Sequence, residues 1–164
     1  MDIAEGGFRI VMRGQPHVTK QEFETPAGRM SAHLYSSDRP ASYYAVGYSD
    51  YPLAFAVTEN PEAMFKGVRD TWVRRIGGRI VGLDRKLTLA GKYPGVEFTA
   101  EGNAKGADAF LQARLFLVDQ RLYQVIVMGL KNQVPQGEVN RFLDSFQLVE
   151  GRDVTTMQIR PEGK

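Results

Sequence analysis

Apolar residues occupy both faces of a predicted strand pair in the second half of the chain, between Ala107 and Leu130. Along residues 122–128 both alternating sets of side chains are apolar except at Gln124. A strand with two apolar faces is typical of a sheet that is covered on both sides. We therefore predict that this pair lies at the centre of an antiparallel sheet with a layer on each face.

Period two also predicts strands in the first third of the chain, over residues 8–12, 18–25, 29–35 and 43–49. Pro26 excludes a two-residue type I′ or II′ turn between the second and third of these, because proline cannot adopt a positive φ. A four-residue loop built on a type I turn is expected instead. This loop pairs residues 24 with 29, 23 with 30 and 20 with 33, so Lys20 lies opposite His33.

After Ser49 the period changes from two to 3.6, which predicts the main helix. Asn60 suits the N-cap, Pro61 suits the first helical position, and Gly77-Gly78 can end the helix in the left-handed region. Its apolar stripe is expected to comprise Met64 or Phe65, Val68, Trp72 and Ile76.

Further strands are predicted over residues 79–89 and 93–101, and a second, shorter helix starts near Pro135. This helix has a single apolar stripe, made of Val139, Phe142, Leu143 and Phe146, and is expected to cover the sheet face that the main helix leaves open. The predicted fold is α+β, a three-layer α/β/α sandwich with a central, mostly antiparallel twisted sheet. Residues 1–149 form a single domain in this prediction, and residues 150–164 form a polar tail or an added edge strand.

Composition excludes several classes of function. The 164 residues include no cysteine, so disulfides and cysteine chemistry are excluded. The net charge is +2, and the chain does not show the clustered basic excess that is typical of nucleic-acid-binding proteins. No apolar run approaches the ~20 residues of a membrane span. A strand that starts as early as Phe8 suggests a mature or trimmed form from which a leader has been removed.

Candidate catalytic chemistry is sparse. His33 with Glu22 could serve as a general base, but an exposed strand position is more often simply solvated. No nucleophile elbow, P-loop or dinucleotide fingerprint is present, and residues 102–106 favour a hairpin loop over a phosphate loop. We predict no catalytic residue, no metal site and no cofactor, and hence that the protein is not an enzyme.

Candidate binding residues are Tyr43, Tyr48 and Trp72, which could line a pocket between sheet and helix, and Arg74 and Arg75 in the last turn of the main helix. Core and rim positions are the simpler interpretation of the aromatic residues. A solvated helix face is the simpler interpretation of the arginines.

Five strings in this order resemble the PsbP-like α/β/α sandwich family, in particular its small bacterial envelope proteins and lipoproteins: FRIVMRGQP (8–16), YAVGYSDYP (44–52), YPGVEF (93–98), RLYQV (121–125) and FLDSF (142–146). The resemblance covers most of the chain up to about residue 149. It implies a twisted antiparallel sheet between helices and a periplasmic or cell-envelope location. A lipid anchor on a leader that is absent from this sequence is compatible with the resemblance, and a cytoplasmic location is not excluded. It implies no catalytic residues, and Asp119-Gln120 stands where related sequences often have a Gly-Asn type of turn.

Two functions from different classes remain open at this point. The first is a non-enzymatic binding or assembly domain of the bacterial cell envelope with an unidentified protein partner. The second is a small-ligand-binding protein with a pocket between sheet and helix; a hydrolase with dispersed residues is a weaker third. No nucleic acid is expected as a partner, and the expected assembly is a monomer or weak dimer.

Overall fold

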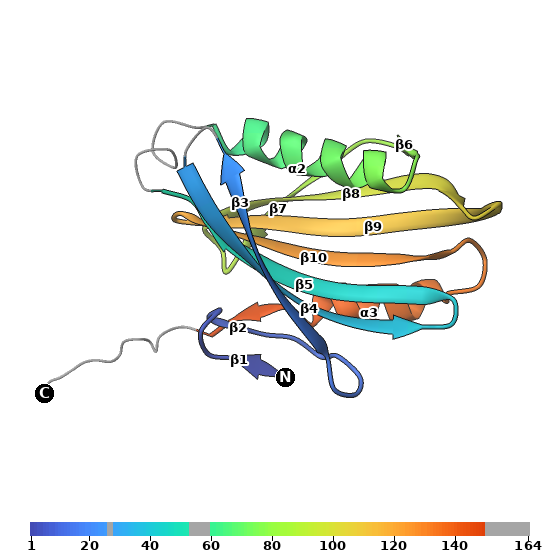
Figure 1. Ribbon diagram of the computed structural model, residues 1–164, viewed down its shortest axis with the longest axis horizontal. Helices are drawn as coiled ribbons and strands as arrows, with labels where there is room; N and C mark the ends of the chain where they lie inside the picture. The colour runs from blue at the N-terminus through green and yellow to red at the C-terminus, as the bar shows by residue number, and fades with distance from the viewer. Residues whose placement is uncertain (26–27, 53–59, 150–164) are drawn as a thin grey trace, which may run out of the picture.

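An eight-stranded antiparallel sheet dominates the computed structural model, which describes residues 1–25, 28–52 and 60–149 (Figure 1). Its strand order is β3-β4-β5-β10-β9-β8-β6, and β7 also pairs with β8. A smaller sheet has the order β1-β2-β11. The elements are β1 (Asp2–Ile3), β2 (Phe8–Arg9), β3 (His17–Thr25), β4 (Gly28–Arg39), β5 (Ser42–Asp50), α2 (Pro61–Arg75), β6 (Arg79–Ile80), β7 (Arg85–Leu89), β8 (Tyr93–Ala104), β9 (Ala107–Val118), β10 (Arg121–Leu130), α3 (Gln136–Asp144) and β11 (Gln147–Leu148).

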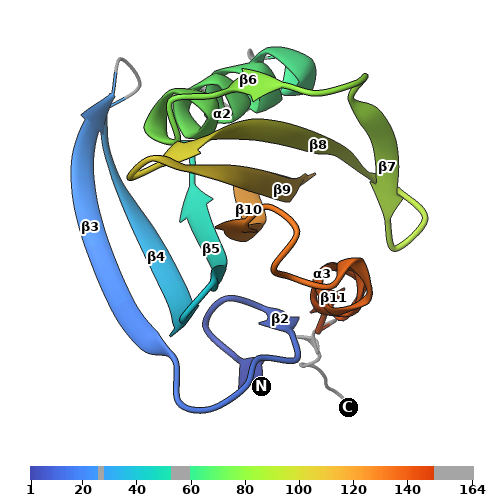
Figure 2. The same ribbon diagram turned by 90° about the vertical axis from the view of Figure 1, so that its right-hand side faces the viewer.

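The two faces of β10 belong to two separate apolar cores. Leu122 and Ile126 pack with the α2 side chains, whereas Tyr123, Val125 and Val127 pack with α3 and the N-terminal segment. Figure 2 shows the curved sheet with α2 against one face and with α3 and β2 against the other. The prediction of a mixed α and β domain with a mostly antiparallel sheet and two helices is confirmed.

The predicted register of β3 and β4 is also confirmed. Glu24 pairs with Arg29, and Lys20 pairs with His33. The expected four-residue loop is wrong, because the ladder continues to a pair of Thr25 with Gly28 and leaves two residues, 26 and 27, between the strands. These two residues lie outside the described residues. Gly28 has a φ of +114°, a conformation that glycine adopts without the steric cost of a Cβ.

Helix α2 has the predicted ends. The Asn60 side chain accepts a hydrogen bond from the Glu62 amide, Pro61 stands in the first turn, and Gly77 follows with a φ of +60°. Met64, Phe65 and Trp72 are its buried residues. In the described part of the chain no helix combines the length and the apolar character that a membrane crossing requires.

Two details differ from the predicted strands. The expected strand over residues 79–89 is two strands, β6 and β7, separated near Gly82, whose φ of +74° breaks the extended conformation. The expected strand over 8–12 is only Phe8–Arg9 and joins the small sheet rather than the large one. The β9–β10 connection is tight, with Asp119 at a φ of +56°, and residues 150–164 lie outside the described residues.

Candidate binding pocket

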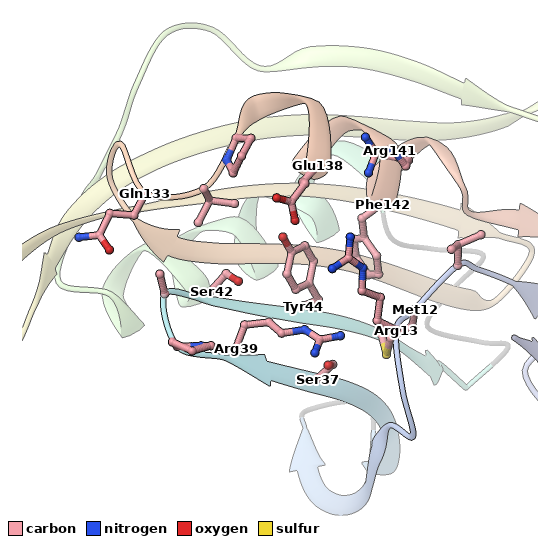
Figure 3. Close-up of a pocket in the computed structure, with 15 residues that line it drawn as sticks. Met12, Arg13, Ser37, Arg39, Ser42, Tyr44, Gln133, Glu138, Arg141 and Phe142 are labelled. Atoms are coloured by element: carbon pink, nitrogen blue, oxygen red, sulfur yellow. The ribbon is translucent and has the colours of Figure 1, made fainter.

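A cavity of about 310 Å³ lies between the end of the β4–β5 hairpin, helix α3 and the N-terminal segment (Figure 3). We call it the hairpin pocket. This volume is near the lower limit for pockets that bind small molecules in proteins. Its lining residues are Val11, Met12, Arg13, Ser37, Arg39, Pro40, Ala41, Ser42, Tyr44, Gln133, Val134, Pro135, Glu138, Arg141 and Phe142.

The strand and helix periods explain why these side chains meet. Ser37 and Tyr44 are direct cross-strand partners on β4 and β5, and they share the sheet face that α3 covers. On α3, Glu138, Arg141 and Phe142 stand at i, i+3 and i+4 and therefore lie on one side of the helix. Two regular elements thus present their side chains to the same space.

Two aromatic rings form the apolar part of the hairpin pocket. The centroids of Tyr44 and Phe142 lie 5.1 Å apart with an interplanar angle of 69°. Phe142 is buried, and Tyr44 and Val134 are partly buried against the same core. The pocket is therefore continuous with the core on the α3 side of the sheet.

Two hydrogen bonds from backbone amides hold the walls of the pocket in place. The Leu130 amide donates to the Ala41 carbonyl at 2.9 Å, which ties the β4–β5 turn to the end of β10. On the other side, the Val11 amide donates to Ser145 Oγ at 3.0 Å and so links the N-terminal segment to the end of α3. The cavity is consequently preformed rather than assembled by a ligand.

The hairpin pocket is lined by more positively charged than negatively charged side chains. Arg13, Arg39 and Arg141 line it together with one carboxylate, that of Glu138. Within the described residues none of these three arginines makes an ion pair or a side-chain hydrogen bond. Figure 3 shows Arg39 and Glu138 on opposite sides of Tyr44, with Arg13 reaching in from the N-terminal segment.

The binding residues predicted from the sequence lie elsewhere and do not share one site. Tyr43 and Trp72 pack in the core under α2, whereas Tyr48 lies in the core under α3. The Trp72 indole donates to Gln124, the Arg75 guanidinium lies 4.8 Å from the Trp72 ring centroid, and Arg74 is exposed. The structure therefore does not bring Tyr43, Tyr48 and Trp72 together around one cavity.

A hydrogen-bonded tyrosine cluster holds the N-terminal loop against the sheet. Tyr35 Oη donates to Glu5 at 3.0 Å, and Tyr123 Oη donates to the Gly6 carbonyl. Arg121 forms two hydrogen bonds with Asp50 and lies 4.5 Å from the Tyr48 ring centroid. Burial raises the pKa of all three tyrosines, and the contact with Glu5 raises the pKa of Tyr35 further.

The candidate base His33 does not meet Glu22. His33 stacks on Tyr48 with ring centroids 4.6 Å apart, and its buried Nδ1 has no partner in the described residues. Glu22 pairs with Arg29 at 3.1 Å. The described residues also contain no group of three or more His, Cys, Asp or Glu side chains suited to a metal ion.

A second cavity, of about 590 Å³, lies between the first turns of α2 and strands β7 and β8. Its charged groups differ from those of the hairpin pocket, because Lys66 pairs with Asp70, Arg69 with Asp84 and Lys86 with Glu62. These ion pairs leave this cavity with much less free positive charge to offer a ligand.

No family model and no curated protein matches the chain. Among solved structures, it is similar to LpqN of Mycobacterium tuberculosis, which is described as involved in cell envelope biogenesis, with a TM-score of 0.51 and 10% identity over 87% of this chain and 91% of that one. PA94 of Pseudomonas aeruginosa, a protein of unknown function, matches with a TM-score of 0.46 and 9% identity over 92% of this chain and 100% of that one. At such identities the likeness concerns the fold alone, and membership of the PsbP-like family stays a prediction.

Sequence reasoning missed most of the hairpin pocket. Tyr44 stands beside Tyr43 in the sequence, and strand alternation could have separated them, because neighbours on a strand point to opposite faces. Phe142 was expected on the apolar stripe of the second helix, where it does lie. Nothing in the sequence pattern indicated that Arg13, Arg39 and Arg141 line the same cavity.

Proposed function

We propose that this chain is a non-enzymatic binding domain of the bacterial cell envelope that holds a small molecule in the hairpin pocket. The observation that carries the proposal is the combination of a preformed cavity, an aromatic floor of Tyr44 and Phe142, and polar side chains at its rim. Binding sites for small molecules generally combine an apolar lining with a few polar groups that orient the ligand.

The fold supports the envelope part of the proposal. The similar structure LpqN is described as involved in cell envelope biogenesis, and the resemblance to PsbP-like envelope proteins points the same way. The placement of α2 and α3 on opposite sheet faces supports the finer description as an α/β/α sandwich of that type. We extend the proposal to a periplasmic location with attachment through a lipidated leader.

The chemistry of the lining residues favours binding over catalysis. A serine nucleophile needs a general base within hydrogen-bond reach. Ser37 and Ser42 line the pocket, but neither makes a side-chain hydrogen bond within the described residues, and no histidine lines the cavity. The residues present can orient a ligand without activating it.

A thermal-shift screen with neutral, anionic and cationic small molecules tests the proposal. Ser42→Phe should fill the hairpin pocket, and Thr88→Phe makes the matched change on strand β7, at the second cavity. We expect hits that stabilise the wild type and Thr88→Phe but not Ser42→Phe; at a ligand concentration of about 100 Kd the gain is about 2.7 kcal/mol. Gln133→Trp, on the exposed turn at the pocket, provides a second block if Ser42→Phe folds poorly. A screen without any hit that is sensitive to both blocking variants would overturn the proposal.

A further inference from the structure

The arginines of the hairpin pocket come from three separate parts of the chain. Arg13 follows β2 in the N-terminal segment, Arg39 ends β4, and Arg141 lies in the last turn of α3. Three guanidinium groups against the one carboxylate of Glu138 leave a local charge of 3 − 1 = +2. Cations gathered at a recess with low-dielectric walls concentrate anions there.

Elsewhere in the described structure, arginines commonly have carboxylate partners. Six of them form ion pairs with aspartate or glutamate, namely Arg9, Arg29, Arg69, Arg85, Arg114 and Arg121. The three arginines at the hairpin pocket do not, although Glu138 lines the same cavity. Their donors are therefore free for a ligand.

We infer, on the basis of the proposed function, that the ligand of the hairpin pocket is a small organic anion with an apolar body. Arg13, Arg39 and Arg141 hold its carboxylate or phosphate, since the planar guanidinium matches both groups with paired hydrogen bonds. The apolar body lies against Tyr44 and Phe142, whose rings form the floor of the cavity.

The shape of the site favours a free small molecule over a membrane surface. The apolar part is recessed, because Phe142 is buried and Tyr44 only partly exposed, so that a flat bilayer cannot reach it together with the arginines. A volume of about 310 Å³ suits a compact acid with a short alkyl or aryl group.

A matched series of eight-carbon probes tests the inference on the full chain. Octanoate and octyl phosphate carry an anion, octanol is neutral and octylammonium is a cation, while the alkyl body stays the same. Isothermal titration should show the tightest binding for the anions, weaker binding for octanol and the weakest for octylammonium. The anions should bind at least about tenfold more tightly than octanol, because charge-assisted hydrogen bonds worth about 1.4 kcal/mol give a tenfold gain in affinity. High salt should weaken the anions and leave octanol nearly unchanged. The comparison of octanoate with octyl phosphate decides which acid group the site prefers.

Substitutions at the pocket then connect the anion preference to named residues. Arg39→Gln and Arg13→Gln should each weaken octanoate by about tenfold, whereas Arg74→Gln on α2 should not change it. Glu138→Gln should strengthen octanoate binding, because it removes the one carboxylate at the pocket. A gain of affinity cannot arise from misfolding, so this variant keeps the test sound even if an arginine variant is unstable.

The possible failures are distinguishable. If octanol binds as tightly as octanoate and both are lost in Ser42→Phe, the pocket binds ligands but the inferred anion preference is wrong. If no probe binds in a manner sensitive to Ser42→Phe, the inference and the proposed function both fail. If octanoate does not bind but the protein sediments with vesicles of phosphatidylcholine and phosphatidylglycerol in an Arg39-dependent manner, the arginines serve a membrane surface and the inference is overturned.

Discussion

The indole N–H of Trp72 donates a hydrogen bond of 2.7 Å to Oε1 of Gln124, and this bond joins α2 to the centre of β10. Trp72 is buried and Gln124 is partly buried, so little water can replace either partner. Gln124 is the polar exception among residues 122–128 of strand β10, and its side chain accepts the hydrogen bond of the indole.

The first prediction concerns this hydrogen bond. Gln124→Leu should lower the free energy of unfolding by about 1–2 kcal/mol, because the buried indole N–H would lose its partner. Urea unfolding measures the change, and since the chain has a single tryptophan, fluorescence reports directly on this site. The double variant with Trp72→Phe, followed by circular dichroism, is the control. The double variant should lose less unfolding free energy than the sum of the losses in the two single variants, Gln124→Leu and Trp72→Phe. If the losses simply add, the hydrogen bond contributes nothing to stability.

The second prediction concerns the acid stability provided by Glu97. Burial acts to raise the pKa of this carboxyl, but hydrogen bonds from Arg114 and Arg85 outweigh it and hold the pKa below its ordinary value. A carboxyl with a lowered pKa stabilises the fold above its unfolded pKa, and this contribution is lost as the pH falls through the folded pKa. Glu97→Gln should therefore cost about 1–3 kcal/mol at neutral pH and progressively less in acid.

Unfolding free energies of the wild type and Glu97→Gln across the acid range check this prediction. Glu62→Gln is a suitable control, because the Glu62 side chain is 71% exposed in its pair with Lys86 and should change stability little. A constant difference between wild type and Glu97→Gln at every pH would contradict the proposed linkage.

The sequence predicted those parts of the fold that depend on local pattern. The predicted register placed Lys20 opposite His33, although the loop that the Pro26 argument expected is too long, and the capping residue Asn60 marked the start of α2. The division between β6 and β7 was not predicted, although Gly82 and Asp84, two residue types that are depleted in strands, stand between them. Glycine also occurs inside strands, so its presence alone did not indicate a left-handed conformation that ends β6.

The hairpin pocket illustrates what the sequence could not provide. Its walls combine residues near position 12, the β4–β5 hairpin and residues near position 140, and the distances among them are set by tertiary packing. Tyr43, Tyr48 and Trp72 were grouped because they are aromatic, yet strand alternation places Tyr43 and Tyr48 in different cores, and Trp72 on α2 packs with Tyr43 only. The clustering of the arginines is a property of three-dimensional structure alone.

The third prediction concerns four tyrosines with a raised pKa, of which Tyr35 and Tyr123 anchor the N-terminal loop. Burial raises the pKa of Tyr35, Tyr48, Tyr51 and Tyr123 above the ordinary value for tyrosine. A raised folded pKa means that the stabilisation is complete below the unfolded pKa of about 10 and is lost as the pH rises beyond it. Ultraviolet titration should therefore show these residues ionising only together with alkaline unfolding. Independent ionisation of all seven tyrosines near the ordinary pKa, in a chain that is still folded, would contradict it.

The last prediction concerns Gly129, which lies where the walls of the hairpin pocket meet β10. A Cβ at this position would stand 2.8 Å from Val134 Cγ2 and 2.9 Å from the Ala41 carbonyl oxygen, and both residues line the pocket. Gly129→Ala should therefore lower the free energy of unfolding by about 1–3 kcal/mol, the usual cost of overpacking, and should weaken octanoate binding by displacing the walls.

Gly137→Ala provides the matched control for Gly129→Ala, because no atom lies within 4 Å of a Cβ at that position in the first turn of α3. It should be neutral or stabilising by up to about 1 kcal/mol, since alanine favours a helix more than glycine does. Chemical unfolding and octanoate titration of both variants separate the two effects. Unchanged octanoate binding in a destabilised Gly129→Ala would mean that the pocket walls adapt, whereas loss of binding in Gly129→Ala alone would show that the glycine holds the cavity open for its ligand.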